Sequence, residues 1–210
     1  NPTRFTITDF YTMYSVFFLP ILLLNIFLLI SMKEKIYAYY IAYVSSFIYW
    51  IAVQSGYYLS LGLPPWSDAL HAVGTLFVLF LTLFSMEYLE LKKRLPKMYQ
   101  AFRIFSILFI TLGFLIALSI PYSSLTFNII SSLFFLLLLA VSIKVLLQGH
   151  IAVRYYLIGL ALYMPTMAMM TLTYNGYLPN IDITRYSFII GSLIEVLFFN
   201  SLMIRRYNFS

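Results

Sequence analysis

The sequence of 210 residues contains no cysteine and only two histidines, and just 10% of its residues are charged. The missing cysteine excludes disulfides, thiolate metal sites and thiol chemistry. The two histidines do not form an HExxH pair, and the sequence has neither a GxSxG elbow nor a glycine-rich phosphate loop. We therefore expect this chain to hold no metal and no cofactor, and we expect no enzyme activity within it.

The low charge also argues against a soluble domain, in which about 25% of the residues are charged. Hydrophobic residues make up 62% of the chain, and its mean hydropathy is +0.92. These residues gather in stretches of about 20, which as helices suffice to cross a hydrocarbon core of about 30 Å. The composition therefore predicts an all-α, polytopic membrane protein.

Hydropathy and helix-breaking residues divide the chain into seven candidate transmembrane helices. Residues 1–8 would form an outer linker, 9–204 a seven-helix transmembrane domain, and 205–210 the start of an inner linker. The chain starts at Asn1, and no signal-peptide pattern precedes the first helix, so we expect a piece of a longer protein. The approximate bounds of the seven helices are 9–31, 36–61, 67–91, 99–119, 123–147, 152–174 and 183–204.

Basic residues collect at one set of helix ends, which predicts the orientation in the membrane. Only Arg4 and Arg185 lie at the opposite ends. Because cytoplasmic loops are enriched in lysine and arginine, the N-terminus should lie outside and the C-terminus inside. The net charge of +6 then reflects this bias, helped by anionic lipid, and does not indicate nucleic-acid binding. The inner set is Lys33, Lys35, Lys92, Lys93, Arg94, Lys97, Arg103, Lys144, Arg154, Arg205 and Arg206.

A single acidic residue, Glu195, interrupts the apolar stretch of the last helix. It lies ten residues before Arg205, about 15 Å deep at 1.5 Å per residue. An ionised carboxylate at that depth costs at least about 2.5 kcal/mol, so the side chain should face the bundle. Gly191 and Ser192 precede it by four and three residues and share its face. Three interpretations stay open: a neutral packing group, a switch or ligand contact, and a proton carrier.

The second helix carries a polar stripe at spacings of three and four residues, which places its members on one face. We expect this face to look into the bundle, either to bond neighbouring helices or to line an outward cavity. Tyr39 and Tyr40, nearer the inner surface, are typical of an interfacial aromatic belt. The stripe consists of Tyr43, Ser46, Trp50, Gln54 and Tyr57.

Two further polar residues are candidates for a ligand or switch site. Asn25 lies deep in the first helix, beyond Pro20, where it could satisfy a backbone group or contact a ligand. His71 lies near the outer surface, close to Asp68. It is either an ordinary interfacial histidine or an external sensor of pH or ligand.

Several ordered segments resemble the bacterial seven-transmembrane receptors with diverse intracellular signalling modules. They are "NIFLLISMKEKIYAYYIAYVSSFIYWIAVQSGYYLSL", "FSMEYLELKKRLPKM", "YNGYLPN" and "IGSLIEVLFFNSLMIRR", the last of which places Glu195 on a glutamate of the family's last helix. The resemblance implies an extracellular sensor domain before the first helix and a cytoplasmic kinase, cyclase or phosphatase after the seventh. It also implies a multi-pass protein of the bacterial inner membrane.

These observations favour a receptor domain that couples an extracellular or periplasmic sensor or ligand to a cytoplasmic effector. Its partners would be membrane lipids and the two flanking domains, and a homodimer is possible because many such effectors act as dimers. One alternative is a small membrane transporter or lipid-binding protein, and another is a scaffold that only anchors the flanking domains. Transporters often show internal repeats, and no convincing repeat is found in this sequence.

Overall fold

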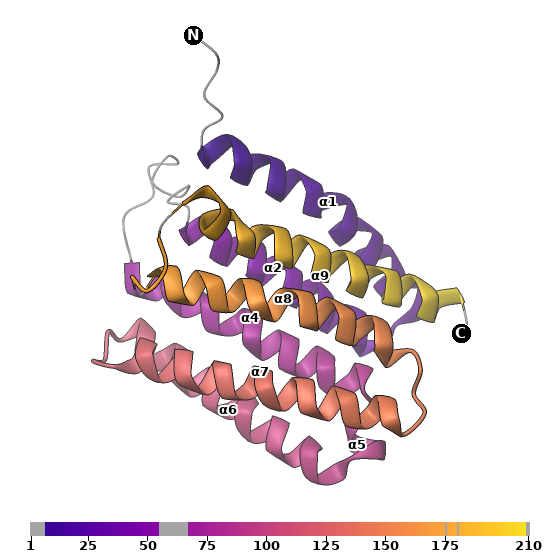
Figure 1. The fold of residues 1–210 in the computed structure, drawn as a ribbon. Helices are drawn as coiled ribbons and strands as arrows, with labels where there is room; N and C mark the ends of the chain where they lie inside the picture. Colours follow the sequence, from indigo (N-terminus) through magenta and orange to yellow (C-terminus); the bar gives the residue numbers. More distant parts are fainter. Residues whose placement is uncertain (1–6, 55–66, 175, 180, 209–210) are drawn as a thin grey trace. The chain divides into compact units, whose positions relative to one another are not determined.

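A computed structural model of the protein describes residues 7–54, 67–174, 176–179 and 181–208, and within these ranges it contains helices and no strand. This confirms the all-α prediction for that part of the chain. Figure 1 labels the helices. Their bounds are α1 Ile7–Met32, α2 Lys35–Gln54, α4 Ser67–Tyr88, α5 Leu91–Arg94, α6 Pro96–Ala117, α7 Ser123–Leu147, α8 Val153–Tyr174 and α9 Asp182–Asn208.

The chain forms two compact units, with their boundary inside α7. The first unit contains α1, α2, α4, α5, α6 and the part of α7 up to Ser132. The second contains α7 from Leu133 onward, together with α8 and α9.

In the first unit, α2 packs against both α1 and α4, and α4 packs in turn against α6 (Figure 1). Three contacts fix the antiparallel register of α2 and α4. The rings of Tyr40 and Phe84 lie 5.4 Å apart, and those of Phe47 and Phe77 lie 5.6 Å apart. In the third contact, the indole of Trp50 lies against Gly74. Because the helices alternate in direction, the α1–α2 turn and the α4–α6 connection lie at the same end of this unit.

The prediction for the Glu90–Lys97 region is wrong in detail. The third helix was expected to continue to Leu91 and the fourth to begin near Tyr99. Instead α4 ends at Tyr88, and the short helix α5 follows before α6 begins at Pro96. Glu90 has a left-handed backbone with φ of 49°, which ends the preceding helix. Proline is favoured at the first helical position because its fixed φ suits a helix and its missing N–H is not needed there.

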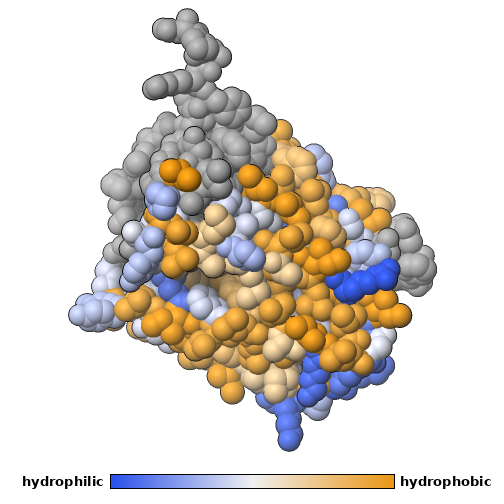
Figure 2. All heavy atoms as spheres, in the orientation of Figure 1, coloured by the Kyte–Doolittle hydropathy of each residue, from blue (hydrophilic) through white to orange (hydrophobic). Residues whose placement is uncertain are grey.

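Two helices, α6 and α7, are long and apolar enough to cross a membrane, judged by length and composition in the part of the chain described. Shorter apolar segments occupy Val16–Met32, Ala72–Tyr88 and Ile190–Ile204. Large hydrophobic side chains remain exposed on these helices, among them Phe27 of α1 and Ile107 of α6. The face shown in Figure 2 is accordingly dominated by hydrophobic residues. Such a surface suits contact with lipid rather than water.

The interfacial role expected for Tyr40 is wrong. Its side chain is completely buried in the first unit and packs against Phe84, whereas a belt residue would face the headgroups. The position of Tyr40 in the sequence indicates only how far along α2 it lies. It does not show which side of α2 packs against α4.

Candidate functional site

The candidate site is built on α8 and α9, which run antiparallel and pack along each other in the second unit (Figure 1). The rings of Tyr156 and Phe199 stack at 4.8 Å with an interplanar angle of 6°. Gly159 lies under the same ring, because a Cβ added there would stand 3.2 Å from Phe199 Cε1. This first contact brings the two backbones close together in the C-terminal half of α9.

A second close contact lies two turns away along α9. A Cβ added to Gly191 would lie 2.7 Å from Cγ2 and 2.8 Å from Cβ of Thr166, so only glycine fits beside that side chain. The Thr166 hydroxyl is held by donating to the carbonyl oxygen of Tyr163 at 2.7 Å. The neighbouring Pro165 cannot donate a backbone hydrogen bond, which weakens the helix ladder at this level of α8. The tight Gly191–Thr166 contact therefore lies next to the turn of α8 in which Pro165 removes a backbone hydrogen bond.

Glu195 lies midway between these two contacts, four residues from Gly191 and four from Phe199, on the face of α9 that meets α8. Its side chain is 0% exposed, and so is that of Ser192. Both residues interact with other groups of the protein, so neither is an isolated polar side chain. Burial on the packed face of α9 is what the sequence predicted for this acid.

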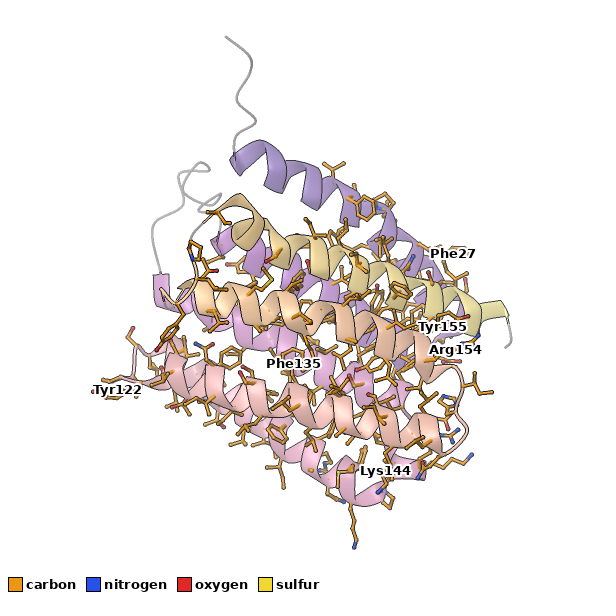
Figure 3. The ribbon with its side chains drawn as sticks, viewed as in Figure 1. Phe27, Tyr122, Phe135, Lys144, Arg154 and Tyr155 are labelled. Atoms are coloured by element: carbon orange, nitrogen blue, oxygen red, sulfur yellow. The ribbon has the colours of Figure 1, made fainter. Side chains whose placement is uncertain are left out.

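The antiparallel register places Tyr163 of α8 at the level of Glu195. Gly159 contacts Phe199 and Thr166 contacts Gly191, so the midpoint of α9 faces residues 162 and 163 of α8. Of these, Leu162 is exposed and Tyr163 is buried. Phe135 of α7, which is labelled in Figure 3, packs against Tyr163 with ring centres 6.0 Å apart. A phenol and a carboxyl group thus lie at the same depth in an apolar helix pair.

The buried carboxyl group is the feature of this arrangement that a change in packing would affect most. Among the residues that the structure describes, no group of three or more His, Cys, Asp and Glu could hold a metal ion. A buried carboxyl group is instead sensitive to its surroundings, because removing its partner from a low-dielectric site costs several kcal/mol. If two packings of α8 against α9 gave the Glu195 carboxyl group different partners, their free energies would therefore differ substantially.

Asn25 is completely buried in α1, and its Nδ2 donates to the carbonyl oxygen of Ile21 at 2.8 Å. The acceptor lies one turn back in the same helix, just after Pro20. Asn25 therefore satisfies a backbone carbonyl group of its own helix, in the turn that follows Pro20. The sequence left this interpretation open beside that of a ligand contact.

Trp50 packs between α2 and α4 in the first unit. A Cβ added to Gly74 would lie 2.6 Å from Cδ1 of the indole, and the ring of Phe77 lies 5.6 Å away. Tyr43, two turns earlier in the stripe, is completely buried. The hydroxyl of Ser46 donates to the carbonyl oxygen of Ala42 at 2.6 Å. These three members of the stripe therefore lie wholly or partly inside the unit.

Three predicted site residues fall outside what can be placed. Tyr57 lies outside the described residues, and so do the side chains of Gln54 and His71, although their backbones belong to α2 and α4. The cavity proposed along the polar stripe and the sensor role of His71 stay predictions.

Sequence reasoning missed Tyr163 and Thr166, which lie on the facing helix. The available signal was the short connection between the last two helices, which makes them antiparallel neighbours. The spacing of Gly191, Glu195 and Phe199 identifies the face of α9 that meets its neighbour. The register of α8, however, depends on where Gly159 meets Phe199, and a pattern within one helix cannot supply that.

Comparison with known families gives a match over residues 8–206, to a family model described as 7TM diverse intracellular signalling. The matched range reaches from the first turn of α1 into the last turns of α9. Searches of the curated proteins and of the solved structures find no match.

Proposed function

Because the chain belongs to the 7TM diverse intracellular signalling family and is a membrane signalling domain, we propose that it passes a signal from an extracellular sensor or ligand to a cytoplasmic effector. The effector would be a kinase, cyclase or phosphatase outside this chain, and the chain itself would be no enzyme. The observation that carries the proposal is the burial of Glu195 between the two close contacts of α8 and α9.

The proposal requires seven crossings of a bacterial inner membrane, with the N-terminus outside and the C-terminus inside. Charge distribution within each unit supports this topology. In the first unit, Lys33, Lys35 and the basic residues of α5 lie at one end, whereas the α6–α7 turn, residues 118–122, contains no basic residue. In the second unit, Lys144 and Arg154 flank the α7–α8 turn (Figure 3). The described α8–α9 connection, residues 176–179 and 181, contains none.

The mechanism is a shift between two packings of α8 against α9. A ligand or an outer-domain movement can shift that equilibrium only by interacting differently with the two packings. Glu195 supplies such a difference, because pairing or unpairing a buried carboxyl group changes the free energy by several kcal/mol. The shift in packing would be passed to the effector through α9, which continues to Asn208. If the effector acts as a dimer, the chain would form a homodimer with it.

The test is made in the full-length protein that contains this chain, with Glu195→Gln and Glu195→Leu compared with the exposed-face control Leu197→Ala. Effector output and thermal stability are measured for each variant. We expect Glu195→Gln to fold and to lock effector output in one state, because glutamine has the shape of glutamate but no carboxyl group. We expect Glu195→Leu to change both output and stability.

Normal signalling and normal melting in both variants would show that Glu195 neither biases the packing nor anchors it. A loss of stability with unchanged ligand response would leave only the packing interpretation. Ligand-driven substrate flux in liposomes, with no change in effector output, would favour the transporter alternative instead.

A further inference from the structure

A shallow groove of about 220 Å³ opens between α4 and α6 in the first unit. One wall is formed by Ala72, Val73 and Leu76 of α4. The other is formed by Ile110, Phe114 and Ala117 of α6. Phe114 is 68% exposed and Ile110 is 46% exposed, so the groove opens onto the outer surface of the unit. Its lining spans the last two turns of α6, one of the two helices long and apolar enough to cross a membrane.

The groove exists because its floor is made of small residues that cannot be enlarged. A Cβ added to Gly113 would lie 2.5 Å from Oγ1 of Thr75, so the two backbones meet there. The Thr75 hydroxyl, the polar group in the lining, donates to the carbonyl oxygen of Ala72 at 2.7 Å. Ala72 and Ala117 leave the upper part open between the larger side chains of Leu76 and Phe114. The result is a hydrocarbon-lined hollow with its one hydroxyl donor already engaged.

We propose that this groove binds one acyl chain of a membrane phospholipid. A polar ligand would lose its hydration without gaining hydrogen bonds there, which costs about 2 kcal/mol or more for each buried polar group. A second protein copy is disfavoured by size, since a stable interface buries about 1,200 Å² or more, far beyond a hollow lined by eight residues. A flexible hydrocarbon chain lying along the helices fits both the size and the polarity.

The turn that follows α6 gives the groove no cation with which to select a lipid headgroup. The groove runs to the end of α6 at Ala117, and the turn that follows, residues 118–122, contains no lysine or arginine. No cation of that turn is therefore available to hold an anionic phosphate. Selection would act on the acyl chain. The inference rests on the membrane location of the chain and not on its signalling role.

The test uses the full-length protein in nanodiscs of phosphatidylcholine that contain a small fraction of phosphatidylcholine with a photoactivatable diazirine in one acyl chain. Labelled positions are mapped by mass spectrometry of peptides. We expect labelling of Leu76, Ile110 and Phe114 to exceed that of the exposed α7 residues Leu133 and Leu136 several-fold. Unlabelled phosphatidylglycerol should compete as well as unlabelled phosphatidylcholine.

Ala117→Phe fills the groove, and Ala140→Phe places the same ring on an exposed position of α7 as the matched control. The first should reduce groove labelling several-fold and the second should leave it unchanged. Ala72→Leu, which fills the groove from the opposite wall, replaces Ala117→Phe if that variant does not fold. Lipid labelling reports on the acyl-chain site, whereas effector output reports on the proposed signalling role. One proposal can therefore fail without the other.

Three outcomes would overturn the inference. Labelling of the groove that equals labelling of α7 and ignores both filling variants would show ordinary boundary lipid. Displacement of the label by an equimolar free fatty acid would assign the site to that ligand. Disulfide-linked dimers that form with Ala117→Cys and are absent from the protein without that change would assign the groove to a second copy.

Discussion

At the residue scale, the α8–α9 contact depends on the absence of a side chain at Gly191. The close approach to Thr166 is possible only because no Cβ stands between the helices. Close backbone approach at small residues is also how transmembrane helices gain packing energy, since lipid removes most of the hydrophobic driving force. The glycine therefore fixes the depth at which the buried acid one turn later meets α8.

Gly191→Ala should destabilise the protein by about 1–3 kcal/mol, the usual penalty for overpacking. The added methyl group meets Thr166, a β-branched side chain whose hydroxyl is bonded to Tyr163 and which therefore cannot swing aside. The measurement is the midpoint of thermal unfolding in detergent. Combining the change with Thr166→Gly removes the collision, so the double variant should lose less stability than the two single changes add up to. Strict additivity would mean that the two residues do not touch.

How much of the site the sequence could predict is clearest at Glu195. Its burial and its shared face with Ser192 follow from helical spacing and from the cost of a carboxylate in hydrocarbon. The identity of the facing residues does not follow, because the register between two helices is set by their packed side chains. Asn25 shows the same limit, since only the structure shows that its amide bonds to Ile21 rather than to another helix.

At the element scale, the helices were largely predictable and their connections less so. The prediction for 123–147 matches α7 at both ends, because this long and mostly apolar stretch is followed closely by Gly149. α9 continues to Asn208, beyond the predicted 204, because the polar residues that follow the apolar stretch do not end a helix by themselves. α5 was missed because a four-residue helix leaves no periodic pattern in the sequence.

The pairing of α8 with α9 should depend strongly on the stacked rings of Tyr156 and Phe199. Phe199→Ala removes this stack and leaves a space above Gly159, which in a soluble core costs about 3–5 kcal/mol. In lipid we expect about 1–3 kcal/mol, since the packing is lost but little hydrophobic transfer energy is. Leu197→Ala, at an exposed position of the same helix, should lie within about 0.5 kcal/mol of the wild type.

The readout for this pair of variants is the thermal midpoint, together with the distance between spin labels on α8 and α9. Phe199→Ala should broaden the distance distribution, because one of the two close contacts is gone. A distribution as narrow as that of Leu197→Ala would show that the stack does not hold the helices together.

At the scale of the whole molecule, composition and charge predicted the class of protein, and the family match over residues 8–206 confirms it. The direction of the chain across the membrane is a separate matter, which rests on the basic residues at alternate connections. Signalling from outside to inside requires that the two ends of the domain lie on opposite sides. The account therefore depends on an odd number of crossings.

The decisive measurement is the accessibility of single cysteines to a membrane-impermeant maleimide, applied from the periplasmic side of intact spheroplasts. The chain has no cysteine, so each variant adds one reporting position within it, and labelling is compared with that of the protein without the change. We expect Tyr122→Cys and Tyr177→Cys, both at highly exposed connections, to be labelled from outside. Lys92→Cys and Gln148→Cys should react only after the membrane is opened. Labelling of all four from outside, or of Lys92→Cys and not of Tyr122→Cys, would contradict the proposed receptor topology.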